Sequence, residues 1–209
     1  GRITHHPGDI AGAVFQRVLN VRPGKPPDIP AQYNRPRKGQ DDSFNSSDPS
    51  RGGYFSGGQH WSETTADDGI AFLRDASKRK EPFFIHLSFN APHDPRQAPE
   101  AYLRLYDPEG LPLPETFQPE YPGGAAIGCR PGLHDERLAP FPRTPEAIRV
   151  HRQEYYALIS LLDAQIGRVL EALELAGLTD STYILFTSDN GLSLGAHGLM
   201  ANRTCMTTA

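Results

Sequence analysis

The sequence predicts an α/β fold with a mostly parallel sheet, and the order of three segments leads to this prediction. Residues 83–89 (Phe-Phe-Ile-His-Leu-Ser-Phe) and 182–187 (Thr-Tyr-Ile-Leu-Phe-Thr) are short, nearly continuous apolar runs, which are typical of strands buried on both faces. A long helical pattern at about residues 145–176 lies between them. A strand, a long connection, a helix and a second strand is the usual order in α/β proteins with parallel sheets.

A shorter helix is predicted before the first apolar run, and it ends at about Lys78. Either Ser62 or Thr64 can cap its N-terminus, because a short hydroxyl side chain accepts a hydrogen bond from the first helical turn. Its apolar positions recur at helical spacing and form one face, which comprises Ala66, Ile70, Leu73 and Ala76. His86, within the apolar run that follows, is predicted to be a core histidine.

A proline-rich connection separates the first apolar run from the long helix. Between Pro92 and Pro145 lie 12 of the 20 prolines, and no proline follows Pro145. Glycine and proline together account for 40 of the 209 residues, which indicates extensive loops. Residues 1–60 have the same irregular character, so the chain is predicted to divide into a loop-rich part over residues 1–60 and a core over residues 61–200.

The long helix has the clearest pattern in the chain. Gly177 follows its last apolar position, where a C-terminal cap belongs. Its apolar residues form one stripe, which consists of Tyr155, Leu158, Ile159, Leu162, Ile166, Val169, Leu170 and Leu173. The second apolar run follows directly and ends in residues 188–191 (Ser-Asp-Asn-Gly).

Charge and hydropathy exclude two classes of function. The formal net charge is −4, and the chain has no basic stripe of the kind that binds nucleic acid. No apolar segment approaches the 18 or so residues that a membrane span requires. The two cysteines, Cys129 and Cys205, lack the spacing of metal ligands and are too few for a disulfide framework.

Polar residues follow both apolar runs, at the sheet edge where α/β proteins bind ligands. His93 lies just after the first run, and Asp189 and Asn190 end the second. A carboxylate beside an amide oxygen suits Ca²⁺ or Mg²⁺ rather than zinc, and a neighbouring imidazole can move a proton. Taken alone, Asp-Asn-Gly is also an ordinary turn after a strand.

Three segments in this order resemble the type I, formylglycine-dependent sulfatases of the alkaline phosphatase superfamily. Residues 83–103 include an Ala-Pro-His-x-Pro loop after a strand, residues 155–173 resemble the helix that follows in that family, and residues 187–199 are similar to its second metal-binding strand end. The resemblance covers about residues 61–200 and is strongest to bacterial enzymes like choline sulfatase and iduronate sulfatase. It implies a mostly parallel sheet sandwiched by helices, of which this chain holds an incomplete part.

The resemblance also implies roles for individual residues. Asp189 and Asn190 match two ligands of a Ca²⁺ ion, with Mg²⁺ the lesser candidate, and His93 matches a histidine that contacts the sulfate ester and assists proton transfer. His197 is expected to have a structural hydrogen-bonding role. The implied substrate is a small-molecule or carbohydrate sulfate ester, and the implied location is periplasmic or secreted.

Several elements of the family are predicted to precede residue 1. These are the paired aspartates of the first strand, the Cys/Ser-x-Pro-x-Arg motif that becomes formylglycine, and a Gly-Lys-x-His segment. Cys129 begins a partial imitation of the motif, but Leu133 stands where arginine belongs. The chain is therefore predicted to be a partial catalytic domain over residues 1–200 that is inactive alone.

Residues 201–209 (Ala-Asn-Arg-Thr-Cys-Met-Thr-Thr-Ala) are predicted to be a frameshifted tail. The family continues here with a segment similar to Gly-Lys-Gln-Asp-Leu-Tyr-Asp-His-Ser, which GGC AAA CAG GAC CTG TAT GAC CAC AGC encodes. Deleting one G gives GCA AAC AGG ACC TGT ATG ACC ACA GC, which translates into all nine observed residues. Resequencing around the Met200 codon tests this prediction, and an intact frame would contradict it.

Two other functions remain open beside the sulfatase. The first is a phosphodiesterase or phosphonate monoester hydrolase of the same superfamily, which uses a related metal site. The second is a catalytically inactive remnant or binding module that keeps half of a metal site. The missing nucleophile segment would discriminate between the two kinds of hydrolase, and an inactive full-length protein would favour the remnant.

Overall fold

The computed structural model describes residues 15–19, 59–93, 96, 98–126, 136 and 139–200. Cys129 and the predicted tail at residues 201–209 lie outside these residues. The chain divides into two compact units. Of the described residues, the first unit contains 15–19, 59–93 and 159–185, and the second contains 96, 98–126, 136, 139–158 and 186–200.

Helix α2 (Trp61–Ala76) confirms the first predicted helix but has a different cap. His60 is the N-cap residue: its Nδ1 accepts a hydrogen bond from the backbone N–H of Ser62 at 3.1 Å. The Glu63 carboxylate accepts the His60 N–H in return at 2.7 Å, which completes a capping box. The prediction of Ser62 or Thr64 as the cap is wrong, because the capping hydrogen bond is accepted by the imidazole nitrogen of His60 and not by a hydroxyl oxygen.

Helix α4 (Pro145–Leu175) is the long predicted helix. Thr144 caps it by accepting the Ala147 N–H on its side-chain oxygen at 3.2 Å, and Pro145 occupies the first helical position, where its missing N–H costs nothing. At the other end Gly177 has a φ of 68°. Its N–H and that of Leu178 donate to Glu174 O and Leu173 O, which confirms the predicted glycine cap.

The apolar stripe of α4 is confirmed only in part. Leu158 and Leu173 are buried, but Ile159 and Leu170 are 40% and 42% exposed. Leu161, which the stripe omitted, is fully buried.

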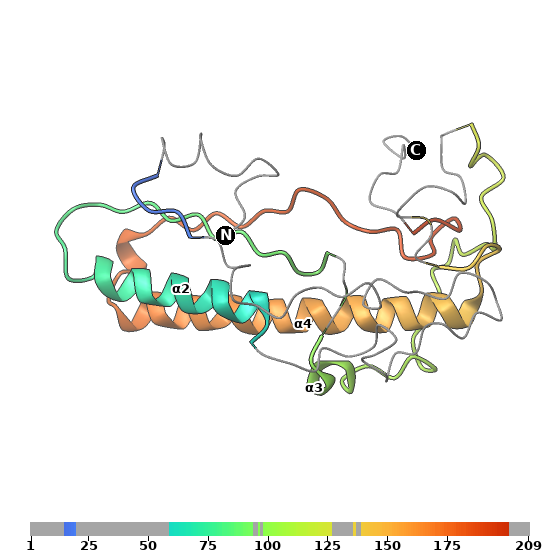
Figure 1. Cartoon of the computed structure of the whole chain (residues 1–209), viewed down its shortest axis with the longest axis horizontal. Coiled ribbons are helices and arrows are strands. Elements are labelled where there is room, and N and C mark those ends of the chain that lie inside the picture. Colours follow the sequence, from blue (N-terminus) through green and yellow to red (C-terminus); the bar gives the residue numbers. More distant parts are fainter. Residues whose placement is uncertain are drawn as a thin grey trace. The chain divides into compact units, whose positions relative to one another are not determined.

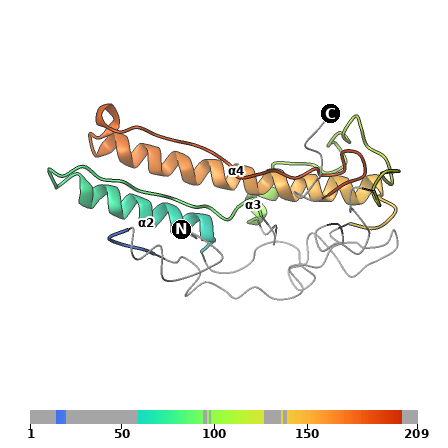
Figure 2. The same cartoon turned by 90° about the horizontal axis from the view of Figure 1, so that it is seen from above.

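In the first unit, α2 lies alongside residues 159–175 of α4 (Figures 1 and 2). An ion pair joins them, with Arg168 Nη2 at 2.6 Å from Asp67 Oδ1. Residues 82–90 run back along α2 (Figure 2). Phe83 packs edge-on against Phe72, with ring centroids 5.8 Å apart, and Leu87 fills the space over Gly69.

The second unit is built around a small apolar core. Its buried members are Ala139, Ile148, Leu194 and Met200, with Leu113, Phe117, Tyr155 and Leu192 packed against them. A short helix, α3 (Glu100–Leu103), precedes the loops of this unit. The Gln153 side-chain amide on α4 donates to Leu103 O and Tyr106 O, at 3.2 and 2.7 Å. This core holds the end of the described chain in place.

The two predicted strands are extended segments that do not pair with another strand within the described residues. The prediction that they are buried is wrong here: Phe84, Leu185 and Phe186 are 73%, 91% and 77% exposed. His86, predicted to lie in the core, is exposed as well. A strand is buried only when sheet neighbours and helices cover both of its faces. The parallel sheet therefore stays a prediction.

Replacing Leu185 by lysine is expected to reduce self-association of the chain. Residues 183–186 combine extended backbone with exposed apolar side chains, and such a segment is a template for pairing with another chain. Sedimentation velocity over a concentration series measures the change. Leu175→Lys is the matched control, since Leu175 is 83% exposed but ends a hydrogen-bonded helix. An equal effect of both substitutions would contradict the prediction.

Within the described part of the chain, no helix combines the length and the apolarity that crossing a bilayer demands.

Candidate functional site

Asp189 and Asn190 lie at the end of the second extended segment, and their side chains are exposed. Asp189 Oδ1 accepts the N–H of Asn190 at 3.0 Å, and Ser188 Oγ donates to Asn190 O at 2.8 Å. These local bonds shape the turn at the end of the segment, and both residues present oxygen-bearing side chains at the surface. Such oxygens are the donors that Ca²⁺ prefers.

The two residues alone supply only part of a calcium site. Among the described residues, no group of three or more His, Cys, Asp or Glu side chains is placed to hold a metal. Ca²⁺ takes six to eight oxygen ligands, so Asp189 and Asn190 fit the ion in the kind of donor but would need further oxygens to complete its coordination.

A tight turn at residues 193–200 follows the candidate metal ligands. Leu194, Gly195, His197 and Gly198 have φ values of 47°, 91°, 53° and 74°. A non-glycine residue in this left-handed region costs about 1–3 kcal/mol. The turn is closed by a hydrogen bond from Gly195 N to Leu199 O at 2.7 Å. Its conformation therefore has to be maintained by contacts with the rest of the unit.

Some of these contacts come from residues 116–118. The N–H of His197 donates to Thr116 O at 3.0 Å, and the Gln118 side-chain amide donates to His197 O at 3.3 Å. An isolated β-bridge pairs Phe117 with Ala196. Both backbone groups of His197 thus have hydrogen-bond partners, and the predicted structural role of its imidazole stays a prediction.

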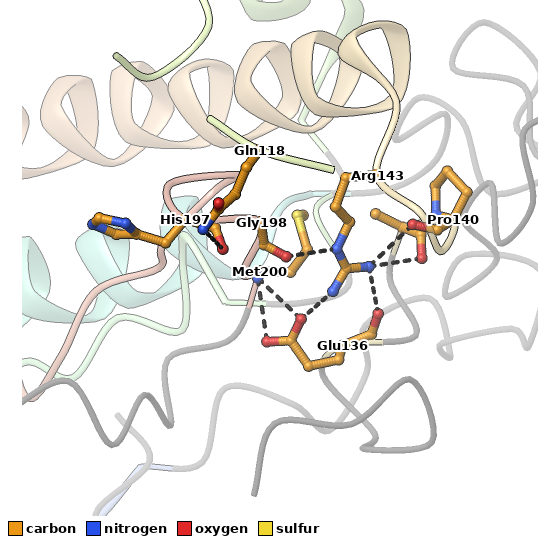
Figure 3. Close-up of polar contacts among 8 residues, drawn as sticks. Gln118, Glu136, Pro140, Arg143, His197, Gly198 and Met200 are labelled. Carbon is orange, nitrogen blue, oxygen red and sulfur yellow. Dashed lines mark hydrogen bonds and ion pairs between the residues drawn. The ribbon is translucent and has the colours of Figure 1, made fainter. Parts of the chain in front are cut away.

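A buried ion pair holds the other side of the turn. Glu136 and Arg143 have fully buried side chains, and the Glu136 carboxylate accepts from Arg143 Nη2. Arg143 Nε donates to Gly198 O at 2.9 Å, and both Glu136 carboxylate oxygens lie 3.2 Å from Met200 N. Figure 3 shows the pair lying against residues 198–200.

Burial dominates the electrostatics of Arg143. Loss of water lowers the pKa of Arg143 to about 10, and the neighbouring Glu136 carboxylate partly offsets this effect. The guanidinium also lies over the Phe141 ring, 3.7 Å from its centroid. Arg143 therefore stays charged at neutral pH, and its charge is balanced inside the protein.

His93 lies in a different part of the chain, directly after residues 83–89. Its N–H donates to Asn90 O at 2.9 Å and forms a turn, and its imidazole is exposed. His93 belongs to the first unit, whereas Asp189 and Asn190 belong to the second. A common site for the three residues stays a prediction.

Arg96, three residues beyond His93, is anchored on α4. Its guanidinium is buried, contacts His151 Nδ1 and the His151 carbonyl oxygen, and lies 3.9 Å from the Glu154 carboxylate. The sequence reasoning assigned no role to His151 and did not single out Arg96. No local spacing signals this cluster, since Arg96 and His151 are 55 positions apart.

Tyr155 is expected to lower the stability of the fold as the pH rises above about 10. Burial raises the pKa of Tyr155 above its ordinary value of 10.0, and Arg96 opposes the shift. The unfolded tyrosine ionises first, so between the two pKa values the unfolded state releases the proton and gains stability relative to the folded state. Urea denaturation between pH 8 and 11.5 measures the loss.

Tyr155→Phe should make this alkaline loss smaller. Tyr183→Phe is the control, because the Tyr183 side chain is fully exposed and keeps the surroundings it has in the unfolded chain. A Tyr155→Phe protein with the same alkaline profile as the unsubstituted chain would contradict the prediction.

Comparison with known proteins shows which sequences and structures the chain is similar to. The sequence model of the Sulfatase family matches residues 29–207. The chain is 32% identical over 145 residues to human iduronate 2-sulfatase, a match that covers 64% of this chain and 26% of that enzyme. It is 33% identical over 143 residues to an arylsulfatase of Clostridium perfringens, which covers 66% and 28%.

A solved structure is also similar. The phosphonate monoester hydrolase of Agrobacterium radiobacter matches with a TM-score of 0.54 and 28% identity, over 66% of this chain and 29% of that protein. The chain therefore spans about a quarter of the length of the curated relatives it matches.

Proposed function

The chain belongs to the sulfatase family, and from that premise we propose that it is part of a hydrolase that cleaves sulfate esters of small molecules or carbohydrates. One observation carries the proposal: the family match spans His93, Asp189 and Asn190 together. These are the residues whose side chains suit proton transfer and oxygen ligation. A periplasmic or secreted location is part of the same proposal.

Asp189 and Asn190 would hold a Ca²⁺ ion, to which other parts of the protein add the remaining oxygens. The bound cation would stabilise the anionic oxygens that develop on the sulfuryl group. The residues would supply a carboxylate charge and a neutral amide oxygen, and both side chains are exposed.

His93 is proposed to contact the sulfate ester and to protonate the leaving oxygen. Its imidazole is exposed on a hydrogen-bonded turn, so it is accessible to a substrate. A positioned general acid of this kind contributes about 10²–10⁴-fold to the rate. The nucleophile is proposed to be a formylglycine that lies outside residues 1–209, and for this reason the chain alone is expected to be inactive.

The test compares this chain with a longer polypeptide that carries a Cys/Ser-x-Pro-x-Arg motif upstream of it. With Ca²⁺ present, the chain alone should not hydrolyse p-nitrophenyl sulfate and the longer polypeptide should. In the longer protein, His93→Gln should lower kcat by about 100-fold or more. Turnover by the chain alone would refute the expected inactivity, and an inactive longer protein would favour a catalytically inactive remnant.

A second candidate is a phosphonate monoester hydrolase. The Agrobacterium radiobacter structure favours it through its 28% identity and TM-score of 0.54. Parallel assays with p-nitrophenyl phenylphosphonate separate the two functions, because a sulfatase should have a higher kcat/KM on the sulfate ester.

A further inference from the structure

The buried Glu136–Arg143 pair has a geometry that suits the control of backbone position. We propose that the two are positioning residues, which hold the 193–200 turn and through it set the orientation of Asp189 and Asn190. The inference rests on the proposed function, in which these two residues bind the metal. Figure 3 shows the contacts that carry it.

Arg143 connects two segments of backbone through one rigid group. Its Nη1 donates to the carbonyl oxygens of Glu136, Ala139 and Pro140, at 2.8, 2.9 and 3.3 Å. Its Nε donates to Gly198 O at 2.9 Å. Because the guanidinium is planar and its donors have fixed directions, Gly198 is held in a fixed relation to residues 136–140.

Glu136 completes the connection from the opposite side. Its carboxylate accepts from Arg143 and lies 3.2 Å from Met200 N through both oxygens. The backbone N–H of Arg143 also donates to Pro119 O at 2.7 Å. The turn is therefore fixed at Gly198 and at Met200 by two charged side chains that are themselves fully buried.

The turn is linked closely to the candidate ligands. Leu192 packs on the same apolar core as Leu194 and Met200, and it lies two residues after Asn190. Movement of the turn would therefore be passed along a few backbone bonds to Asp189 and Asn190. Groups that orient ligand-bearing segments affect metal affinity without touching the metal.

The chemistry of the pair also distinguishes positioning from simple packing. A well-packed apolar pair often gives equal or greater stability than a buried ion pair, so the attraction between the two charges does not by itself account for this pair. Directed hydrogen bonds to carbonyl oxygens give the geometry that apolar contacts do not provide. The charged side chains of Glu136 and Arg143 are therefore suited to fixing the position of the backbone of the turn.

The test uses the ¹⁵N-labelled chain at a temperature where circular dichroism shows each variant folded. The variants are Arg143→Met, Arg143→Lys and Glu136→Gln. Amide resonances of Asp189 and Asn190 in the chain report their conformation, and calorimetric titration of the longer polypeptide, which would supply the remaining oxygens, gives the Kd for Ca²⁺. Arg104→Met is the matched control, since Arg104 forms an exposed pair with Glu100 at 2.5 Å.

Arg143→Met and Glu136→Gln are expected to shift both amide resonances and to weaken Ca²⁺ binding by about 10-fold or more. Arg143→Lys should restore part of the affinity, because it keeps the charge but loses the fork geometry. The Arg104→Met control should leave the resonances and Kd unchanged. Should Arg143→Met fail to fold, Arg143→Lys and Glu136→Gln decide the question.

A folded variant in which the resonances of Asp189 and Asn190 and the Kd all stay as in the unsubstituted protein would overturn the inference. Absence of Ca²⁺ binding by the unsubstituted longer polypeptide would instead contradict the proposed metal site. In that case the resonances alone decide whether Glu136 and Arg143 position the two residues: shifted resonances support the inference, and unshifted resonances overturn it.

Discussion

Arg143→Met is expected to lower the free energy of unfolding by about 3–5 kcal/mol, the usual cost of breaking a buried ion pair by removing one partner. The substitution leaves the Glu136 carboxylate fully buried without its cation. Methionine keeps an apolar chain over the Phe141 ring, where the guanidinium lies 3.7 Å from the centroid. The loss therefore reports charge and hydrogen bonding more than packing, and urea denaturation followed at 222 nm measures it.

A double substitution, Arg143→Met with Glu136→Leu, makes the prediction sharper. Replacing both members of an ordinary buried ion pair by apolar residues is often neutral or stabilising. Here the pair also forms hydrogen bonds with backbone groups. Each buried group that loses its hydrogen-bond partner lowers the free energy of unfolding by about 1–3 kcal/mol. The groups are the N–H of Met200 and the carbonyl oxygens of Glu136, Ala139, Pro140 and Gly198.

The double variant should consequently stay at least about 3 kcal/mol less stable than the unsubstituted chain. If the free energy of unfolding of the double variant lies within about 1 kcal/mol of that of the unsubstituted chain, the pair is an ordinary ion pair that apolar residues can replace. The exposed Glu100–Arg104 pair provides the comparison, since its removal should cost under about 1 kcal/mol.

Gly198→Ala is the second substitution with a large expected effect. Gly198 has a φ of 74°, and a Cβ on it would lie 2.7 Å from Gln118 O and 3.2 Å from the backbone of Glu120. Because the obstacle is backbone, it has little freedom to move aside. The combined cost of left-handed strain and overpacking is about 3 kcal/mol.

Gly177→Ala is a matched control for this substitution. Gly177 has a similar φ of 68°, but nothing lies within 4 Å of the Cβ position. Its replacement should cost about 1 kcal/mol, from strain alone. Thermal denaturation of the two variants gives the difference, and equal losses would mean that the close approach at Gly198 has no energetic consequence.

The helices could be predicted from sequence because their signals are local. Periodicity and Gly177 gave the limits of α4 to within a residue or so, and the apolar face of α2 was right at Ala66, Leu73 and Ala76. The cap of α2 was missed because His60 is not among the usual N-cap residues. Local patterns therefore predicted the two longer helices and both ends of α4, and they missed the residue that caps α2.

The burial of the two extended segments could not be predicted from local sequence. An apolar run such as residues 182–187 indicates β-structure, but its burial depends on neighbouring strands that local sequence does not specify. The exposure of Leu185, at 91%, follows from that dependence.

Only those candidate site residues that lie in a short sequence motif could be proposed from the sequence. Asp189 and Asn190 stood out as oxygen ligands at a strand end, whereas Glu136 and Arg143 did not. Arg143 meets Gly198 across 55 positions of sequence, and no spacing rule marks such a contact. Buried polar networks of this kind become visible only when the fold brings distant backbone groups together.

The extended segment at residues 182–187 has a further consequence for handling the protein. Proteases cut most readily where exposed backbone is free to enter their active sites, and Tyr183 and Phe186 present aromatic side chains on such backbone. Chymotrypsin should therefore nick the chain here before it cuts within α4. One cut at this place would separate Asp189 and Asn190 covalently from the long helix, so a clipped preparation would keep its helices while the two candidate ligands are on a separate peptide.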